Sequence, residues 1–283
     1  MNRKPVVLTL VMLLALAVGL PAAPAAAAEP EGTVYLALGD SLGWGYGATD
    51  PLETAYVPHF YRFLQGDSHS RARELVNLSV GGETSESFIT GWLDPGPLRT
   101  PQLDQAIAVI ADPDTDVSVV TLDIGGNDLL GLLRPGQACS AYPPTSECLA
   151  AAQAAIGQFY QNYGYILTVL TQALATDPGE ETLMVMTYYN PWSGTGSAYE
   201  GVVTMLMLGA EPGTDCAAPA ATFGMNDIIT CVGMALGATV VDVYPRFVGK
   251  GVELTHITEG DIHANDSGYA QIASEFRAAY MNK

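Results

Sequence analysis

Short apolar runs recur along this chain with room for a helix between them, and this recurrence constrains the fold more than any other feature. The runs are rich in β-branched and aromatic residues, as buried strands are. They lie at Val34–Leu38, Leu75–Leu78, Val117–Ile124, Thr182–Thr187 and Thr239–Val243, and one long helix is predicted within Ala150–Ala175. Alternating strands and helices predict a three-layer α/β/α fold, in which a mostly parallel sheet of about five strands lies between helices.

The amino-terminal segment has the pattern of a secretory signal peptide. Residues 5–19 are apolar and follow Arg3 and Lys4, and small residues from Ala22 onward suit cleavage near Ala28. A single membrane anchor is the alternative, but the apolar core is shorter than the roughly 20 residues that a spanning helix needs. We therefore expect residues 1–28 to be removed, and residues 29–283 to form one secreted domain without a stable membrane span.

The charge balance limits the partners. The chain has 11 Lys and Arg against 30 Asp and Glu, which gives a formal net charge of −19. Such a negative field repels phosphate backbones and anionic lipid surfaces. Nucleic acid is therefore excluded as an expected partner, whereas neutral or cationic substrates are not.

The chain has four cysteines, all beyond the predicted signal peptide. An exported protein meets an oxidising compartment, so two disulfides are expected. Cys139–Cys148 and Cys216–Cys231 form the simplest of the possible pairings, because each closes a local loop. A zinc site is the alternative, but neither pair has the Cys-x-x-Cys spacing and no histidine is near.

Two segments interrupt the alternation of strands and helices. Residues 132–148 are rich in Pro and Gly, and residues 190–223 are dominated by Gly, Ser, Thr and Met. Loops longer than about 15 residues are uncommon unless they are functional or disordered, so we expect both segments to wall a substrate site. Tyr188–Trp192 precedes the second segment, and its aromatic residues suit either a pocket lining or the core.

A serine follows the first predicted strand directly, in the sequence Gly39-Asp40-Ser41-Leu42. In an open parallel sheet, ligands bind at the carboxyl ends of the strands, so this position suits chemistry. The residues also fit the Gly-x-Ser-x-Gly elbow of α/β-hydrolases through Gly43, but that fold needs strands and an oxyanion loop upstream of the serine. Almost no chain precedes Ser41 once the signal peptide is removed.

A base and oxyanion donors can meet this serine. His263 precedes the last predicted helix and can reach the same sheet edge, where it would take the hydroxyl proton of Ser41. His256 is the rival base. Gly82 follows the second strand and Asn127 the third, so a backbone N–H and a side-chain amide are available to bind an oxyanion.

Taken in order, Gly-Asp-Ser-Leu, Gly82, Gly-Gly-Asn-Asp and His-x-Asn-x-x-Gly-Tyr resemble the SGNH/GDSL family of serine esterases and lipases over the whole mature chain. The resemblance implies that Ser41 is the nucleophile and His263 the base. It also implies that the Ser41 backbone N–H, Gly82 and Asn127 form the oxyanion hole.

The residues before the histidine depart from the family pattern. The family usually has an aspartate three residues before the histidine, where this chain has Gly260, and Asp261 lies only two before it. Asp261 can orient the imidazole if the loop curls, because a triad is defined by geometry. Otherwise a backbone carbonyl near Gly260 would hold the ring.

The expected function is that of a secreted serine esterase or lipase acting through an acyl-enzyme on Ser41. Its partners would be small-molecule, lipid or glycan esters, without a cofactor or metal ion, and the protein is expected to be a monomer. An acyltransferase or carbohydrate deacetylase on the same fold is an alternative, and so is a non-catalytic secreted binding protein. The sequence does not separate the acyl chains or leaving groups, because specificity depends on the loops.

Overall fold

The computed structural model describes residues 32–92, 99–134, 136–140, 143–177, 179–209, 215–217 and 222–283. The expected signal peptide, residues 1–28, lies outside these ranges, as do parts of both predicted excursions.

A five-stranded parallel sheet lies at the centre of the molecule, in the order β2-β1-β3-β4-β5. The strands are β1 (Thr33–Gly39), β2 (Ala72–Asn77), β3 (Val117–Asp123), β4 (Thr182–Met186) and β5 (Thr239–Val241). Every residue of β1, β3 and β4 is buried, as expected for parallel strands that helices cover on both faces. The predicted α/β fold with a parallel sheet is therefore confirmed.

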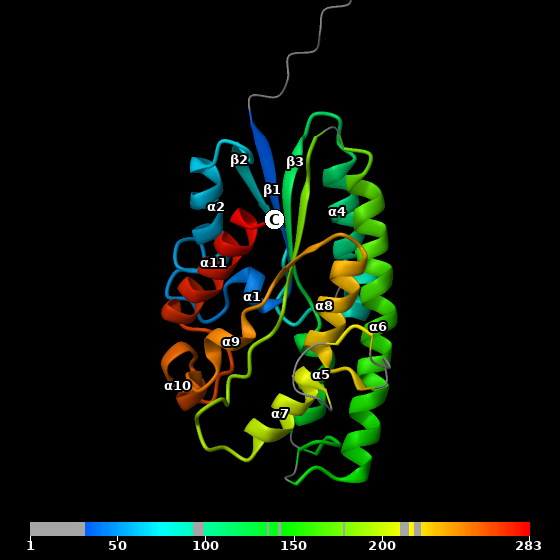
Figure 1. Ribbon diagram of the computed structural model, residues 1–283, viewed down its shortest axis with the longest axis vertical. Helices are drawn as coiled ribbons and strands as arrows, with labels where there is room; N and C mark the ends of the chain where they lie inside the picture. Colours follow the sequence, from blue (N-terminus) through cyan, green and yellow to red (C-terminus); the bar gives the residue numbers. More distant parts are fainter. Residues whose placement is uncertain are drawn as a thin grey trace, which may run out of the picture.

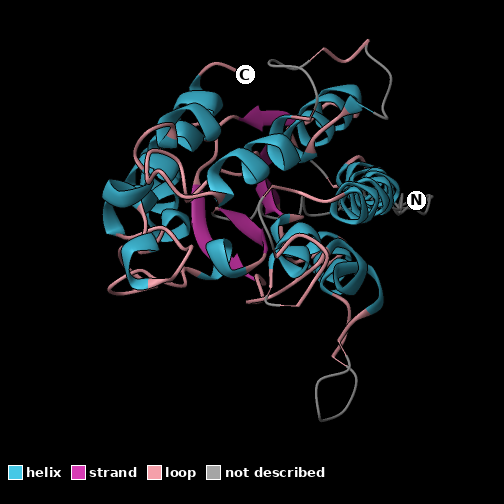
Figure 2. Ribbon diagram, turned by 90° about the horizontal axis from the view of Figure 1, so that it is seen from below, coloured by secondary structure: helices cyan, strands magenta, loops and turns pink. Residues whose placement is uncertain are grey.

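Helices cover the sheet in two layers (Figures 1 and 2). One side holds α1 (Ser41–Trp44), α2 (Tyr56–Gly66), α9 (Tyr244–Phe247), α10 (Gly251–Leu254) and α11 (Asp266–Met281). The other holds α4 (Gln102–Ile110), α5 (Gly126–Leu130), α6 (Ser146–Leu174), α7 (Tyr199–Leu208) and α8 (Met225–Ala235), and α3 (Ser85–Thr90) packs on α4 and α6 there. Two 3₁₀ turns, η1 (Gly131–Leu133) and η3 (Ile257–Glu259), follow α5 and α10.

Aromatic side chains join α2 to α11 over one face of the sheet. Tyr56 stacks on Phe276 with ring centroids 4.9 Å apart, and Phe60 lies 5.4 Å from the same ring. Tyr35 of β1 meets Phe60 edge to face at 5.5 Å. The apolar residues that recur at helical spacing in these two segments therefore form core. This packing holds the last helix, and the loop before it, against the first strand.

The strand order creates a crevice at one place on the carboxyl edge of the sheet. The chain moves from β1 to β2 on one side and then crosses to β3 on the other side of β1. In sheets of this order, ligands bind at the switch point between β1 and β3. Gly39 pairs in register with Asp123, so the two strands end level with each other. Ser41 follows one strand and Asn127 the other, so both residues flank this crevice.

The two predicted excursions contain more helix than expected. α6 begins at Ser146, inside the first excursion, where the Thr145 side chain accepts a hydrogen bond from the Cys148 N–H at 3.1 Å. The second excursion contains α7, in which Val202, Val203, Leu206 and Met207 are buried. Met205 and Leu208, at the other positions of this helix, are also apolar, so the sequence shows no contrast between an apolar and a polar face that would have indicated a helix.

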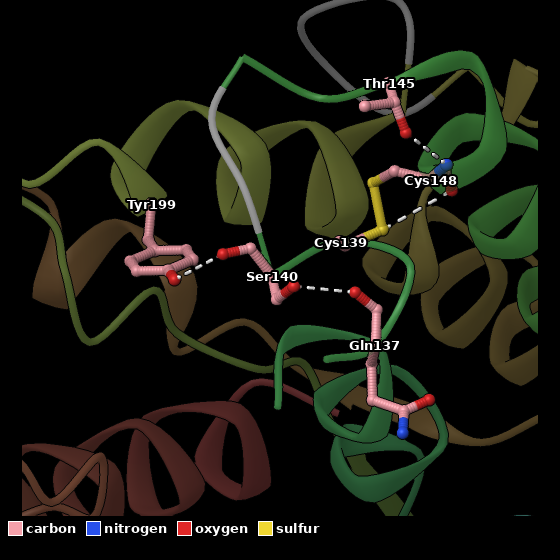
Figure 3. Close-up of a disulfide and its surroundings, with 6 residues drawn as sticks. All are labelled: Gln137, Cys139, Ser140, Thr145, Cys148 and Tyr199. Atoms are coloured by element: carbon pink, nitrogen blue, oxygen red, sulfur yellow. Dashed lines mark hydrogen bonds between the residues drawn. A yellow bond between two sulfur atoms is a disulfide. The ribbon is translucent and has the colours of Figure 1, made fainter. Parts of the chain in front are cut away.

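Disulfides fasten both excursions to neighbouring helices. Cys139 is bonded to Cys148 in the first turn of α6, and Cys216 is bonded to Cys231 of α8. Figure 3 shows the first bond beside Ser140, whose backbone carbonyl accepts a hydrogen bond from the Tyr199 hydroxyl at 2.9 Å. The first excursion therefore contacts the start of α7 in the second.

Candidate active site

Ser41 is the first residue of α1, at the point where β1 ends. The Asp40 side chain caps this helix by accepting a hydrogen bond from the Leu42 N–H at 2.9 Å. Gly39 has a φ of +145°, and a Cβ there would lie 1.6 Å from Oδ1 of Asp123. Only glycine fits at this bend, which turns the chain sharply enough to present Ser41 at the sheet edge.

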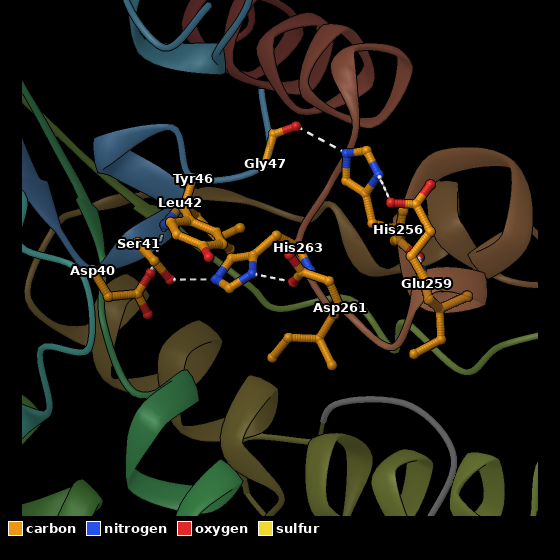
Figure 4. Close-up of polar contacts among 12 residues, drawn as sticks. Asp40, Ser41, Leu42, Tyr46, Gly47, His256, Glu259, Asp261 and His263 are labelled. Atoms are coloured by element: carbon orange, nitrogen blue, oxygen red, sulfur yellow. Dashed lines mark hydrogen bonds and ion pairs between the residues drawn. The ribbon is translucent and has the colours of Figure 1, made fainter. Parts of the chain in front are cut away.

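His263 reaches Ser41 from the loop before α11. Its Nε2 lies 2.9 Å from the Ser41 Oγ, and the Tyr46 ring packs against the imidazole with centroids 4.4 Å apart (Figure 4). The Asn265 side chain caps α11 by accepting a hydrogen bond from the Gly268 N–H at 3.0 Å. This cap fixes where the helix begins, and so where His263 lies relative to the sheet.

Asp261 contacts the other nitrogen of the imidazole. Its Oδ1 lies 2.5 Å from His263 Nδ1 and accepts the His263 backbone N–H at 3.0 Å. Gly260, with a φ of +82°, forms the left-handed end of η3 and curls the chain, which lets an aspartate two residues before the histidine reach the ring. Partial burial works to raise the Asp261 pKa, but hydrogen bonds from His263 outweigh it and the pKa is lowered. Asp261 is therefore an anion at neutral pH.

His256, the rival base, faces away from the serine. Its Nε2 lies 2.9 Å from the Gly47 carbonyl oxygen, and its Nδ1 lies 3.6 Å from the Glu259 carboxylate (Figure 4). Its backbone N–H donates to the His263 carbonyl at 3.0 Å. His256 thus braces the loop that carries His263.

The two predicted oxyanion residues lie beside Ser41, Gly82 on a loop and Asn127 in the first turn of α5. Gly82 has a φ of +84°, and a Cβ there would lie 3.0 Å from the Trp92 ring, so glycine is required. Asn127 Nδ2 donates to the Glu83 carbonyl at 2.9 Å. The second N–H of the same amide makes only a weak contact, with Asn127 Nδ2 lying 3.5 Å from Asp40 Oδ2. That hydrogen is therefore available to a substrate oxygen.

Glu83 is a buried residue of the site that the sequence analysis did not single out. Its Oε1 accepts the Trp92 indole N–H at 2.6 Å and also the Ser87 hydroxyl, and its Oε2 accepts from Gln102 Nε2 at 3.0 Å. Gln102 in turn binds the backbone of Gly39 twice. Its Oε1 accepts the Gly39 N–H at 2.7 Å, and its Nε2 donates to the Gly39 carbonyl at 3.0 Å. This chain of contacts ties the Gly82 loop to the end of β1.

Two further acidic residues lie beneath α1. Asp40 Oδ2 accepts the Tyr188 hydroxyl at 2.6 Å, and Asp40 is only 2% exposed. Asp123 is fully buried under Gly39 and Gly43, where a Cβ on Gly43 would lie 2.8 Å from Asp123 Oδ1. Burial raises the pKa of both carboxyls; the charges of Asp128 and Glu83 also raise the pKa of Asp40, and the charge of Asp40 raises that of Asp123. The only sequence signal for these buried carboxyls was an aspartate at the end of an otherwise apolar run.

A small apolar cavity of about 90 Å³ opens beside Ser41 and His263. Tyr188, Tyr189, Pro191 and Trp192 line it, together with residues of α5 and α7. Tyr188 and Tyr189 also belong to the buried core, so this segment serves both of the roles that its sequence suggested.

A separate cleft of about 400 Å³, lined by Trp44 and Trp92, lies on the other side of the Gly82 loop.

No group of three or more His, Cys, Asp or Glu residues in the described part of the chain has the arrangement of a metal site. None of the helices within the described ranges combines the length and the apolar character that crossing a bilayer requires.

Solved structures of esterases and lipases share this fold. A lipase from a goat rumen metagenome is 20% identical, with a TM-score of 0.56 over 87% of this chain and 97% of that one. The extracellular lipase of Streptomyces rimosus is 19% identical, with a TM-score of 0.53 over 88% and 100%. Axe2, an acetylxylan esterase from Geobacillus stearothermophilus, is 13% identical, with a TM-score of 0.53 over 88% and 95%.

The sequence itself matches a family model. No curated protein matches the chain significantly. The model of the GDSL-like lipase/acylhydrolase family matches residues 37–271, a range that includes Ser41, Gly82, Asn127 and His263. Because this match covers most of the chain, the resemblance seen in the sequence is confirmed: the chain belongs to the GDSL-like lipase/acylhydrolase family and is a hydrolase that acts on ester bonds.

Proposed function

We propose that this protein is a secreted serine esterase that hydrolyses carboxylic esters through an acyl-enzyme on Ser41. The observation that carries the proposal is the continuous line of contacts from Ser41 Oγ to His263 Nε2 and from His263 Nδ1 to Asp261 Oδ1. A serine hydroxyl is a poor nucleophile until a base takes its proton, and this line supplies the base and the anion that orients it.

The first half of the reaction forms the acyl-enzyme. His263 Nε2 takes the Ser41 proton as Oγ bonds to the ester carbonyl carbon, and the carbonyl oxygen becomes an oxyanion. The N–H groups of Ser41 and Gly82 and the second N–H of Asn127 bind that oxygen. The imidazolium then gives its proton to the leaving alcohol as the C–O bond breaks, while the Asp261 carboxylate stabilises the positive ring.

The second half reverses these roles with water as the nucleophile. His263 takes a proton from water, the hydroxide adds to the acyl carbon, and the proton returns to Ser41 as the acid leaves. The imidazole must therefore keep the same orientation through both halves. Packing of Tyr46 on one face of the ring and the His256–His263 backbone contact support this orientation.

A p-nitrophenyl alkylphosphonate tests the serine mechanism directly. We expect one phosphonyl group per protein, located on Ser41 by peptide mass mapping, together with loss of p-nitrophenyl acetate hydrolysis. Protein unfolded in urea is the control and should not react, because the base is then absent. Folded protein that remains unlabelled while it hydrolyses the ester would contradict the proposal.

Export from the cell is part of the same proposal. The apolar leader of residues 1–28 and the disulfides Cys139–Cys148 and Cys216–Cys231 support it, since disulfides persist in oxidising compartments.

A carbohydrate deacetylase is the second candidate function, and the cleft beside the Gly82 loop favours it. The lining of this cleft is more polar than apolar and includes Asn77, Arg99 and Gln105. Trp44 and Trp92 add two indole rings, and the Trp44 side chain is 50% exposed. Aromatic faces framed by amides suit a sugar ring. The structurally similar Axe2 is an acetylxylan esterase.

Substitution of Trp44 tests the second candidate. If a sugar stacks on this indole, Trp44→Ala should lower kcat/KM for acetate release from acetylated xylan about tenfold more than it lowers kcat/KM for p-nitrophenyl acetate. Tyr165→Ala removes an equally exposed aromatic ring on α6 and is the matched control. Equal effects of Trp44→Ala on both substrates would count against a sugar site in this cleft.

A further inference from the structure

The surroundings of Ser41 differ on its two sides, which separates the acyl group from the leaving group. Where Tyr46 packs on His263, the surface is open: Tyr46 is 49% and Trp44 50% exposed, and their rings lie 6.3 Å apart. The leaving alcohol must receive its proton from His263 and then diffuse away, so it belongs on this open side. The acyl group stays bonded to Ser41, which leaves the cavity of about 90 Å³ for it.

That cavity is small and apolar. Leu130 of α5, Tyr188 and Trp192 after β4, and Val203 and Met207 of α7 supply its walls, and of these Tyr188, Val203 and Met207 are buried. For scale, an apolar cavity of about 150 Å³ in another protein accommodates benzene. A space of about 90 Å³ therefore suits an acyl chain shorter than six carbons.

Helix α7 forms the far wall of the cavity. Val203 and Met207 lie one helical turn apart and face the site, whereas Met205, on the opposite side of the helix, lines a different groove of about 550 Å³ together with Leu206. α7 thus partitions the two spaces. A longer acyl chain would have to displace this helix or its side chains.

Hydrogen bonds and tight backbone contacts hold α7 in place. Asn190, which is 1% exposed, donates from Nδ2 to the Glu200 carbonyl at 2.9 Å and to Thr204 Oγ1 at 3.0 Å. At the other end, Gly209 has a φ of +70°, and a Cβ there would lie 2.2 Å from the Thr222 carbonyl oxygen. Displacing the helix would break contacts at both ends.

We propose that α7 restricts this enzyme to short acyl groups, from acetyl to butyryl, and that Met207 sets the limit. The proposal rests on the serine esterase function proposed above and specifies its substrate class. The lipases and the acetylxylan esterase of similar fold differ on this point, so their fold alone does not decide it.

A series of p-nitrophenyl esters from acetate to octanoate, kept below their micellar concentrations, tests the proposal. Wild-type kcat/KM should be highest at acetate, propionate or butyrate and at least tenfold lower at octanoate, because each excess methylene must be forced into packed walls. Met207→Ala should raise the octanoate-to-acetate ratio of kcat/KM at least tenfold. Met205→Ala, the same truncation on the opposite side of α7, should leave that ratio unchanged.

A second variant tests the same wall in case the first variant misfolds. Val203→Ala removes less volume from the same wall and should raise the ratio in the same direction, and far-UV circular dichroism checks that each variant folds. Octanoate turned over as efficiently as acetate by the wild type would overturn the proposal, as would folded Met207→Ala and Val203→Ala proteins with wild-type ratios. Folded wild-type protein that hydrolyses none of the esters would instead overturn the serine esterase function itself.

Discussion

Replacing Ser41 by Ala is expected to lower kcat for p-nitrophenyl acetate at least about a thousandfold, because no other group can form the acyl-enzyme. The oxyanion donors and the cavity remain in the variant, so substrate should still bind and a small residual rate should persist. The change removes one half-buried hydroxyl, so the fold should be unaffected. Initial rates over a range of ester concentrations, with purified wild type and variant side by side, measure both kcat and KM.

Ser79→Ala is the matched control for this experiment. Ser79 lies beside α1, where its Oγ would be 2.3 Å from a Cβ on Gly43, and within the described residues this hydroxyl has no hydrogen-bond partner. Its removal should change kcat by less than about threefold. A Ser41→Ala protein with wild-type kcat would assign the nucleophile to another residue.

Replacing Asp261 by Asn should lower kcat by about two to four orders of magnitude and change KM little. The lowered pKa of Asp261 keeps it ionised at neutral pH, and only an anion both accepts the Nδ1 proton and stabilises the imidazolium of the transition state. Asn has the same size but no charge, and it can turn its N–H₂ toward Nδ1 and favour the wrong tautomer. Steady-state kinetics at pH 7 with p-nitrophenyl acetate measure the loss.

Glu259→Gln separates this effect from a general change of charge in the loop. Glu259 also carries a carboxylate near a histidine, but its side chain is 74% exposed and it faces His256. Its substitution should leave kcat within about twofold, as expected for an exposed ion pair. If Asp261→Asn retains a near wild-type kcat, the orienting role passes to a backbone carbonyl near Gly260.

The sequence predicted the buried parts of the fold best. β1 and β3 are buried throughout and mostly apolar because both faces are covered, and their predicted positions differ from the structure by at most one residue at each end. β2 begins three residues earlier than its predicted start at Leu75, because this edge strand contains exposed charged residues at Arg73 and Glu74 that hide the pattern. α7 was not predicted for the reason given above.

The residues of the site also differ in how well the sequence predicts them. Ser41, Gly82, Asn127 and His263 follow strands or precede a helix, so their places at the sheet edge follow from local patterns and parallel topology. The contacts of Glu83 do not, since its partner Gln102 also binds the backbone of Gly39, 63 positions away in the sequence. The size of the acyl cavity depends on where α7 packs, and one sequence carries no signal of that packing.

The buried carboxyls beneath α1 link the stability of the protein to pH. Asp40 and Asp123 have raised pKa values in the folded state, whereas the unfolded chain returns them to ordinary values near 4. Between those limits the folded state binds more protons than the unfolded state. The contribution of this pair to the free energy of unfolding is therefore greatest in acid and declines as the pH rises toward and past neutrality. The sheet edge that positions the nucleophile is thus held more firmly in mildly acidic surroundings than in alkaline ones.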